Sequence, residues 1–108
     1  MIAHHVFFTL HDGSAENVRK LLDACTKYLP GHDGIGYFAV GPRAPELDRE
    51  VNDRDFHVGL HVVFRDLAAH DAYQIAPDHL KFVAEAKPLW KSVRVFDTVV
   101  EKSPVHGA

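Results

Sequence analysis

Several features are scarce in this sequence, and each scarcity excludes a class of protein. Cys25 is the single cysteine, so no disulfide forms within the chain and a reducing, cytoplasmic location is expected. The apolar segments are too short to span a membrane, and His4 and His5 interrupt the N-terminal run that a signal peptide needs. Lys and Arg number 12 against 15 Asp and Glu, with no basic run, so nucleic acid is not an expected partner. Because no segment is long enough to span a membrane, a membrane is not expected either.

Histidine, in contrast, is abundant, with nine in 108 residues. The remaining composition, 46% hydrophobic and 25% charged, is that of a soluble globular protein. A chain of this length buries enough surface for one modest core and no second one. We therefore expect a single domain over residues 1–108, with its folded core at about 4–100 and a polar tail at 101–108.

The spacing of apolar residues predicts an α+β fold. Alternating and β-branched segments predict strands over residues 4–10, 35–40, 56–64 and 92–100. Helical spacing predicts one helix from about residue 15 to 28, and two short helices that Ala76-Pro77 separates. The order β-α-β-β-α-α-β is that of a ferredoxin-like unit whose second helix is split. Residues 43–55 form a long polar connection, which is typical of a functional or mobile loop.

The strands predict a second copy of the chain as partner. The first and third strands are apolar on both faces, but three helices cover only one face of a four-stranded sheet. The other face requires a partner, and a homodimer through the open sheet faces is the simplest solution. The residues expected at that interface are Val6, Phe8, Val58, Leu60 and Val62.

The histidines do not predict a metal site. His57 and His61 lie on one strand face, but four residues of strand separate them by about 13 Å, too far to share one zinc ion. A site formed by His5 with His57 or His61 would need a carboxylate that the sequence does not place. We therefore expect neither a bound metal nor another cofactor.

Four polar side chains are candidates for a functional cluster. Tyr73 and His79 flank Pro77 on the inward faces of their helices, and His5 and His57 are expected side by side on adjacent strands, facing the helices. The expected lining of this chamber is Phe7, Leu22, Cys25, Phe82 and Trp90. Cys25 has leucine neighbours on its helix and is expected to be a buried apolar residue rather than a nucleophile. The cluster is interpreted either as a ligand pocket or as a hydrogen-bonded network that fills the core.

Several segments resemble one family, the stress responsive A/B barrel (Dabb) domain. The resemblance covers about residues 4–100 and is most specific in Ala72-Tyr73-Gln74-Ile75-Ala76-Pro77-Asp78-His79, within the longer stretch AAHDAYQIAPDHLKFV. Further matching segments are His5 with its strand, the Pro30-Gly31 turn, VNDRDF and VRVFD. The resemblance implies a ferredoxin-like unit whose sheet packs on that of a second copy, forming a dimeric α/β barrel.

The family resemblance also implies a chemistry. Polyketide cyclase members perform an intramolecular aldol condensation, with a catalytic tyrosine and histidine that match Tyr73 and His79, and with pocket residues that match His5, His57 and Trp90. Applied here, His79 would abstract a proton next to a carbonyl of a small molecule and Tyr73 would donate a hydrogen bond to the carbonyl oxygen, without a cofactor. Two alternatives stay open. One is a non-catalytic stress-related binding or structural dimer, and the other is a cofactor-free monooxygenase of the related dimeric barrels.

Overall fold

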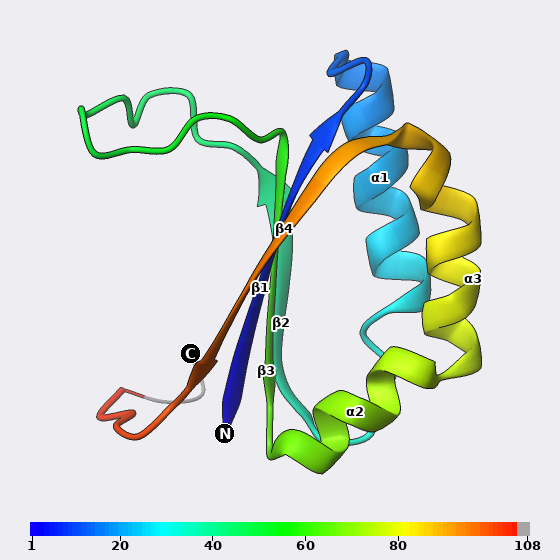
Figure 1. Ribbon diagram of the computed structural model, residues 1–108, viewed down its shortest axis with the longest axis vertical. Helices are drawn as coiled ribbons and strands as arrows, with labels where there is room; N and C mark the ends of the chain where they lie inside the picture. Colours follow the sequence, from blue (N-terminus) through cyan, green and yellow to red (C-terminus); the bar gives the residue numbers. More distant parts are fainter. Residues whose placement is uncertain (106–108) are drawn as a thin grey trace.

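The computed structural model describes residues 1–105 as a four-stranded sheet with all of its helices on one side (Figure 1). The elements in chain order are β1 (Ile2–Leu10), α1 (Ala15–Tyr28), β2 (Ile35–Pro42), β3 (Val58–Phe64), α2 (Leu67–Ile75), α3 (Pro77–Ala86), a 3₁₀ turn (Lys87–Leu89) and β4 (Trp90–Val99). The order of elements confirms the predicted α+β, ferredoxin-like unit. Part of the predicted tail, residues 106–108, lies outside the described residues.

The sheet places β1 and β3 at its centre, in the order β2-β3-β1-β4. All three neighbouring pairs are antiparallel. Val6 lies opposite Leu60 on one side and Val95 on the other, while the next residue pairs, His5 with His61 and Phe96, belong to the opposite face. Each strand therefore contributes alternate residues to a covered face beneath the helices and to an open face.

The covered face carries the hydrophobic core. Its fully or almost fully buried members from the two central strands are Val6, Phe8, Leu10, Val58, Leu60, Val62 and Phe64. The prediction that Val6, Phe8, Val58, Leu60 and Val62 form a dimer interface was therefore wrong. Both alternating sets on these strands are apolar, so the sequence pattern alone does not distinguish the set that the helices cover.

Local capping and proline chemistry set the helix boundaries. The Ser14 hydroxyl accepts a hydrogen bond from the Asn17 N–H, and the Asp66 carboxylate accepts one from the Ala69 N–H at 2.8 Å. Ala76 is extended (φ −65°, ψ 145°) and Pro77 begins the next helix, where its missing N–H costs nothing. The break between α2 and α3 follows from these two residues and leaves Tyr73 and His79 on opposite sides of one bend.

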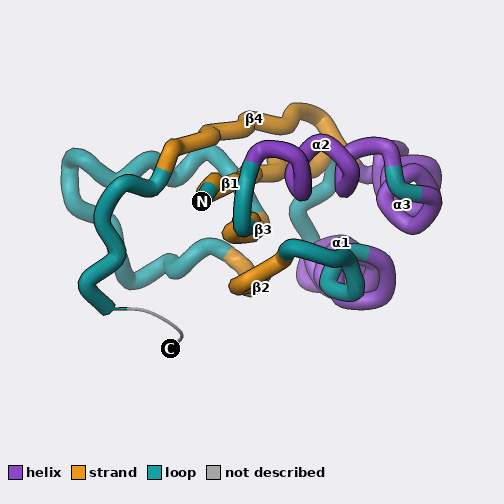
Figure 2. The backbone as a smooth tube through the Cα atoms, turned by 90° about the horizontal axis from the view of Figure 1, so that it is seen from below, coloured by secondary structure: helices purple, strands orange, loops and turns teal. Residues whose placement is uncertain are grey.

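The long connection between β2 and β3 extends on the open side of the sheet, away from the helices (Figures 1 and 2). Residues 43–57 contain no helix or strand. The Arg94 guanidinium on β4 donates hydrogen bonds to the Asp53 carboxylate at 2.7 Å and to the Asp55 carbonyl at 3.1 Å. These bonds hold the loop at the edge of the open face. Among residues 1–105, no helix has the length and apolar character needed to cross a membrane.

Candidate functional site

A cavity of about 200 Å³ opens on the covered face, between β1 and β4 of the sheet and α2 and α3 above it. It exists because the helices leave β4 partly uncovered, so that Val95 is still 49% exposed. The walls are mostly valine, leucine and phenylalanine side chains. The polar or partly polar residues that line it are His4, Tyr73, Gln74, His79 and Trp90. An apolar hollow with a few converging polar groups is typical of a small-molecule site.

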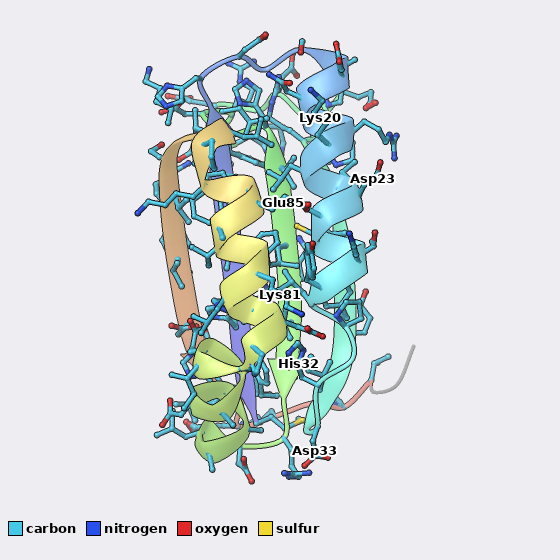
Figure 3. The ribbon with its side chains drawn as sticks, turned by 90° about the vertical axis from the view of Figure 1, so that its right-hand side faces the viewer. Lys20, Asp23, His32, Asp33, Lys81 and Glu85 are labelled. Atoms are coloured by element: carbon cyan, nitrogen blue, oxygen red, sulfur yellow. The ribbon has the colours of Figure 1, made fainter. Side chains whose placement is uncertain are left out.

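A second, larger hollow lies between α1 and α3 on the outer surface, and it differs in chemistry. Lys20 and Asp23 on α1 border it from one side and Glu85 on α3 from the other (Figure 3). These charged groups are solvated, and Lys20 forms an i,i+4 ion pair with Glu16 at 3.6 Å. None of this hollow's lining side chains has a buried polar atom that lacks a partner among the described residues. The cavity beside β4 is the better candidate.

Tyr73 and His79 meet at this cavity from the two sides of the helix break. Their ring centres are 4.7 Å apart in an edge-to-face arrangement, and His32 stacks on Tyr73 with ring centres 5.2 Å apart. Burial raises the pKa of Tyr73, with a smaller contribution from Cys25, so its hydroxyl stays protonated. Burial also lowers the pKa of His79, and the nearby His32, His4 and His70 lower it further. The site therefore combines a hydrogen-bond donor with a neutral imidazole base.

Two buried nitrogens of the cavity wall have no hydrogen-bond partner among residues 1–105. They are His79 Nδ1 and Trp90 Nε1. A buried polar atom without a partner costs about 1–3 kcal/mol. The Trp90 N–H is a donor only, whereas His79 Nδ1 either donates or accepts according to its tautomer. A bound molecule with oxygen atoms facing both nitrogens would remove this cost.

His4 supplies an imidazole that sequence reasoning did not assign to the site. Its side chain is buried, 5% exposed, and its Nδ1–H donates to Asp97 Oδ1 at 2.5 Å. Its ring centre is 5.2 Å from that of His70 and 6.3 Å from that of Tyr73. His4 lies on the same face of β1 as the buried residues Val6, Phe8 and Leu10. This alternation is the sequence signal that could have assigned His4 to the covered face.

His4, His70 and Asp97 each offer one metal-ligating atom, and these three atoms all lie within 4.8 Å of one another. The residues come from β1, α2 and β4. Only the pairing of β4 with β1 brings Asp97 opposite His4, so this set differs from the His5 with His57 or His61 site that the sequence analysis considered. The sequence analysis compared His5, His57 and His61 and did not consider His4, His70 and Asp97 together.

Three of the predicted cluster residues lie elsewhere. His5 is on the open face, where its Nδ1 is 2.8 Å from His61 Nδ1, and Phe7 packs on the Phe56 ring of the same face. His57 Nδ1 accepts the Leu10 N–H at 2.9 Å at the end of the sheet. The prediction that His5, His57 and Phe7 converge with Tyr73 and His79 was wrong. His5 and Phe7 belong to the alternating set that the helices do not cover, and His57 lies just before β3 begins at Val58.

The other predicted lining residues divide into two groups. Phe82 and Trp90 line the cavity. Leu22 and Cys25 are buried in the core between α1 and the sheet and do not line this cavity. Burial raises the pKa of the Cys25 thiol to about 12, so a reactive thiolate does not form at neutral pH.

Comparison with known proteins adds a family and a set of similar folds. A model of the stress responsive A/B barrel domain matches residues 2–100. A Dabb family protein with a ferredoxin-like fold from Mesorhizobium loti is 27% identical, with a TM-score of 0.76 over 94% of this chain and 97% of that one. A dimeric ferredoxin-like protein from Thermobifida fusca is 18% identical, with a TM-score of 0.74 over 92% and 90% of the two chains.

A third similar structure is the hydroxynitrile lyase from Passiflora edulis, 19% identical, with a TM-score of 0.72 over 95% of this chain and 96% of that one. At 18% and 19% identity, the Thermobifida and Passiflora structures establish the fold alone. A comparison with proteins of curated function finds no match.

Proposed function

The chain belongs to the stress responsive A/B barrel domain family, and from this premise we propose that it binds a small carbonyl compound beside β4 and abstracts a proton from it. The observation that carries the proposal is the pair of unpartnered buried nitrogens, His79 Nδ1 and Trp90 Nε1, on the wall of one cavity. The fold can carry a lyase, as the Passiflora edulis enzyme illustrates.

The size and lining of the cavity indicate the class of ligand. An engineered apolar cavity of about 150 Å³ holds benzene, so a cavity of about 200 Å³ holds a ring or short chain with a few additional atoms. Aliphatic and aromatic walls favour an apolar body. His79 Nδ1 and Trp90 Nε1 need polar partners on that body, and the Tyr73 O–H can donate to an oxygen atom beside them. An aryl or alkyl ketone meets both conditions.

Proton abstraction would use Tyr73 and His79 in complementary roles. The unprotonated nitrogen of His79 takes a proton from the carbon next to the carbonyl, and the electrons of that C–H bond move to the oxygen as an enolate. The Tyr73 O–H stabilises the developing negative charge on this oxygen by a hydrogen bond. In a ligand that carries a second carbonyl, the enolate carbon then attacks that carbonyl, forming a C–C bond, and imidazolium returns the proton to the new alkoxide; in a simple ketone the proton returns to carbon. No electron acceptor is needed.

The open face of the sheet would be the homodimer interface. It presents Tyr37, Val63 and Phe96 together with the contacting rings of Phe7 and Phe56. Phe96 is 53% exposed in the single chain, and an aromatic surface of this kind is typical of an association site. The similar protein from Thermobifida fusca is described as dimeric.

The test is the exchange of acetophenone methyl protons for deuterium in D₂O, followed by NMR. We expect the protein to accelerate this exchange and His79→Gln to slow it by about 10²–10⁴-fold. Tyr73→Phe removes the hydrogen bond to the enolate oxygen and slows exchange while keeping the ring. The matched controls are His11→Gln and Tyr37→Phe, which change an exposed histidine and an exposed tyrosine away from the cavity.

Two results would contradict the proposal. Binding of acetophenone without faster exchange would favour a non-catalytic binding module. If no ketone binds, and both His79→Gln and Tyr73→Phe lower the free energy of unfolding by about 2 kcal/mol or more, the pair is a structural network.

A further inference from the structure

We propose that His4, His70 and Asp97 form a binding site for one divalent transition metal ion of the zinc type. The three residues lie far apart in the sequence, on β1, α2 and β4, and the fold brings one ligating atom of each to within 4.8 Å of the others. Two imidazoles and one carboxylate are a donor set that zinc prefers. His4 borders the cavity that holds Tyr73 and His79, but His70 and Asp97 do not line it, and metal binding does not depend on proton abstraction.

The two imidazoles already have the arrangement that one ion requires. Their ring centres are 5.2 Å apart, with an angle of 69° between the ring planes. Two imidazoles bound to one zinc at about 2.0 Å in tetrahedral geometry have ring centres about 5 Å apart. Asp97 is opposite His4 in the β1–β4 pairing and accepts its Nδ1–H; an ion bound between these two atoms would replace that proton, which would be released to water. Small rotations of the partly exposed His70 and Asp97 side chains would close the site.

Neighbouring groups hold the ligands in place. The Nδ1–H of His70 donates to Asp71 Oδ1 at 3.0 Å, which leaves His70 Nε2 unprotonated; a metal there would replace the long hydrogen bond that Nε2 accepts from Gln74. A carboxylate behind a ligating histidine is the usual second contact of zinc sites. The rings of Phe64 and Tyr73 pack against His4, so a charged ion here would be shielded on one side from water.

The protein supplies three ligands, so one coordination position would stay open. His4 and Gln74 both line the cavity beside β4, and Gln74 Nε2 is 3.5 Å from His70 Nε2. The open position therefore lies next to the cavity. Zinc sites with three protein ligands and an open position bind a water or a substrate oxygen there.

The experiment measures zinc chloride binding by calorimetry on metal-free protein without an affinity tag, with visible absorption of tetrahedral Co²⁺ as a second readout. We expect one ion per chain and an unfolding temperature that rises with zinc. Asp97→Asn and His70→Gln should each weaken binding by about 100-fold or more, since even loss of an indirect contact costs 10–100-fold. Both side chains are partly exposed, so these variants are expected to fold.

The control variant is His61→Gln, which breaks the His5–His61 pair on the open face. It should leave zinc affinity unchanged. Absence of zinc binding by the parent protein, or loss of binding in His61→Gln but not in His70→Gln, would overturn the proposal and leave His4–Asp97 as a hydrogen-bonded pair. Ketone exchange is measured on metal-free protein, so the two proposals can fail separately.

Discussion

His4 and His5 are adjacent in the chain but lie in opposite environments. His4 is buried beneath α2, donates to Asp97 and borders the cavity. His5 is on the open face, partly exposed, and contacts His61 there. One peptide unit thus separates a candidate ligand or metal site from a candidate association surface. The difference shows that strand phase determines the role of each histidine here.

The two faces of the sheet also differ in what they leave without a partner: polar atoms on the covered face and aromatic rings on the open face. On the covered face, tight apolar packing surrounds a cavity where His79 Nδ1 and Trp90 Nε1 lack partners among the described residues. On the open face the aromatic rings contact one another, but Phe96 and Tyr37 remain exposed. We infer that the first face is built to hold a small molecule and the second to hold a protein surface.

The largest expected effect comes from a charge on the covered face. Leu60 is 2% exposed, so Leu60→Asp removes core packing and buries a carboxylate without a partner. We expect a loss of about 4 kcal/mol or more in the free energy of unfolding, enough to unfold a marginally stable domain. Urea unfolding followed by circular dichroism measures it. Val63→Asp, on the open face, should cost far less, and an equal loss would contradict the assignment of faces.

A charge on the open face should instead change association. Phe96→Asp is expected to leave a folded monomer at micromolar concentration, because burying an unpaired charge at the interface opposes dimer formation. Light scattering should show half the mass of the parent protein, with an unchanged circular dichroism spectrum. Val95→Asp is the matched control. The Val95 side chain is next to Phe96 in the chain but lines the cavity on the other face, so this substitution should leave the dimer intact. A monomeric parent would refute the proposed interface.

The smallest expected effect is on the pH dependence of stability. Burial lowers the pKa of His79 on the covered face and, with a contribution from His5, that of His61 on the open face. The unfolded chain therefore binds protons at a higher pH than the folded one, and the free energy of unfolding should fall as the pH drops below the ordinary histidine value of about 6.5. Urea unfolding at several pH values measures this slope. His79→Gln and His61→Gln should each reduce it, and an unchanged slope in His79→Gln would contradict burial of a neutral imidazole.

The elements of the fold were predictable because their signals are local. Ser14 and Asp66 cap helices where the sequence indicated, and Pro77 divides α2 from α3. Tyr73 and His79 were recognisable because apolar neighbours at helical spacing placed both on inward faces. Such signals act over a few residues, and distant contacts do not override them here.

The assignment of faces and the His4–His70–Asp97 cluster depended on long-range contacts. Both alternating sets of β1 contain phenylalanine, Phe7 in one and Phe8 in the other, so alternation did not reveal which set the helices cover. Asp97 meets His4 only through the β1–β4 register. The cavity exists because α2 and α3 cover β4 incompletely. The local sequence pattern does not indicate how much of a strand the helices cover.

The tandem His4-His5 has a consequence for how this protein tolerates sequence change. A slip of one residue in the pairing of a strand normally exchanges its two faces and removes any functional side chain from its site. With two consecutive histidines, a slip of one position would still leave an imidazole on the helix side, opposite the strand that carries Asp97. The core residues Val6 and Phe8 would be replaced by Phe7 and Thr9, so the packing would suffer first. A register shift in this segment would therefore retain an imidazole at the polar site but would disrupt the packing of the surrounding core.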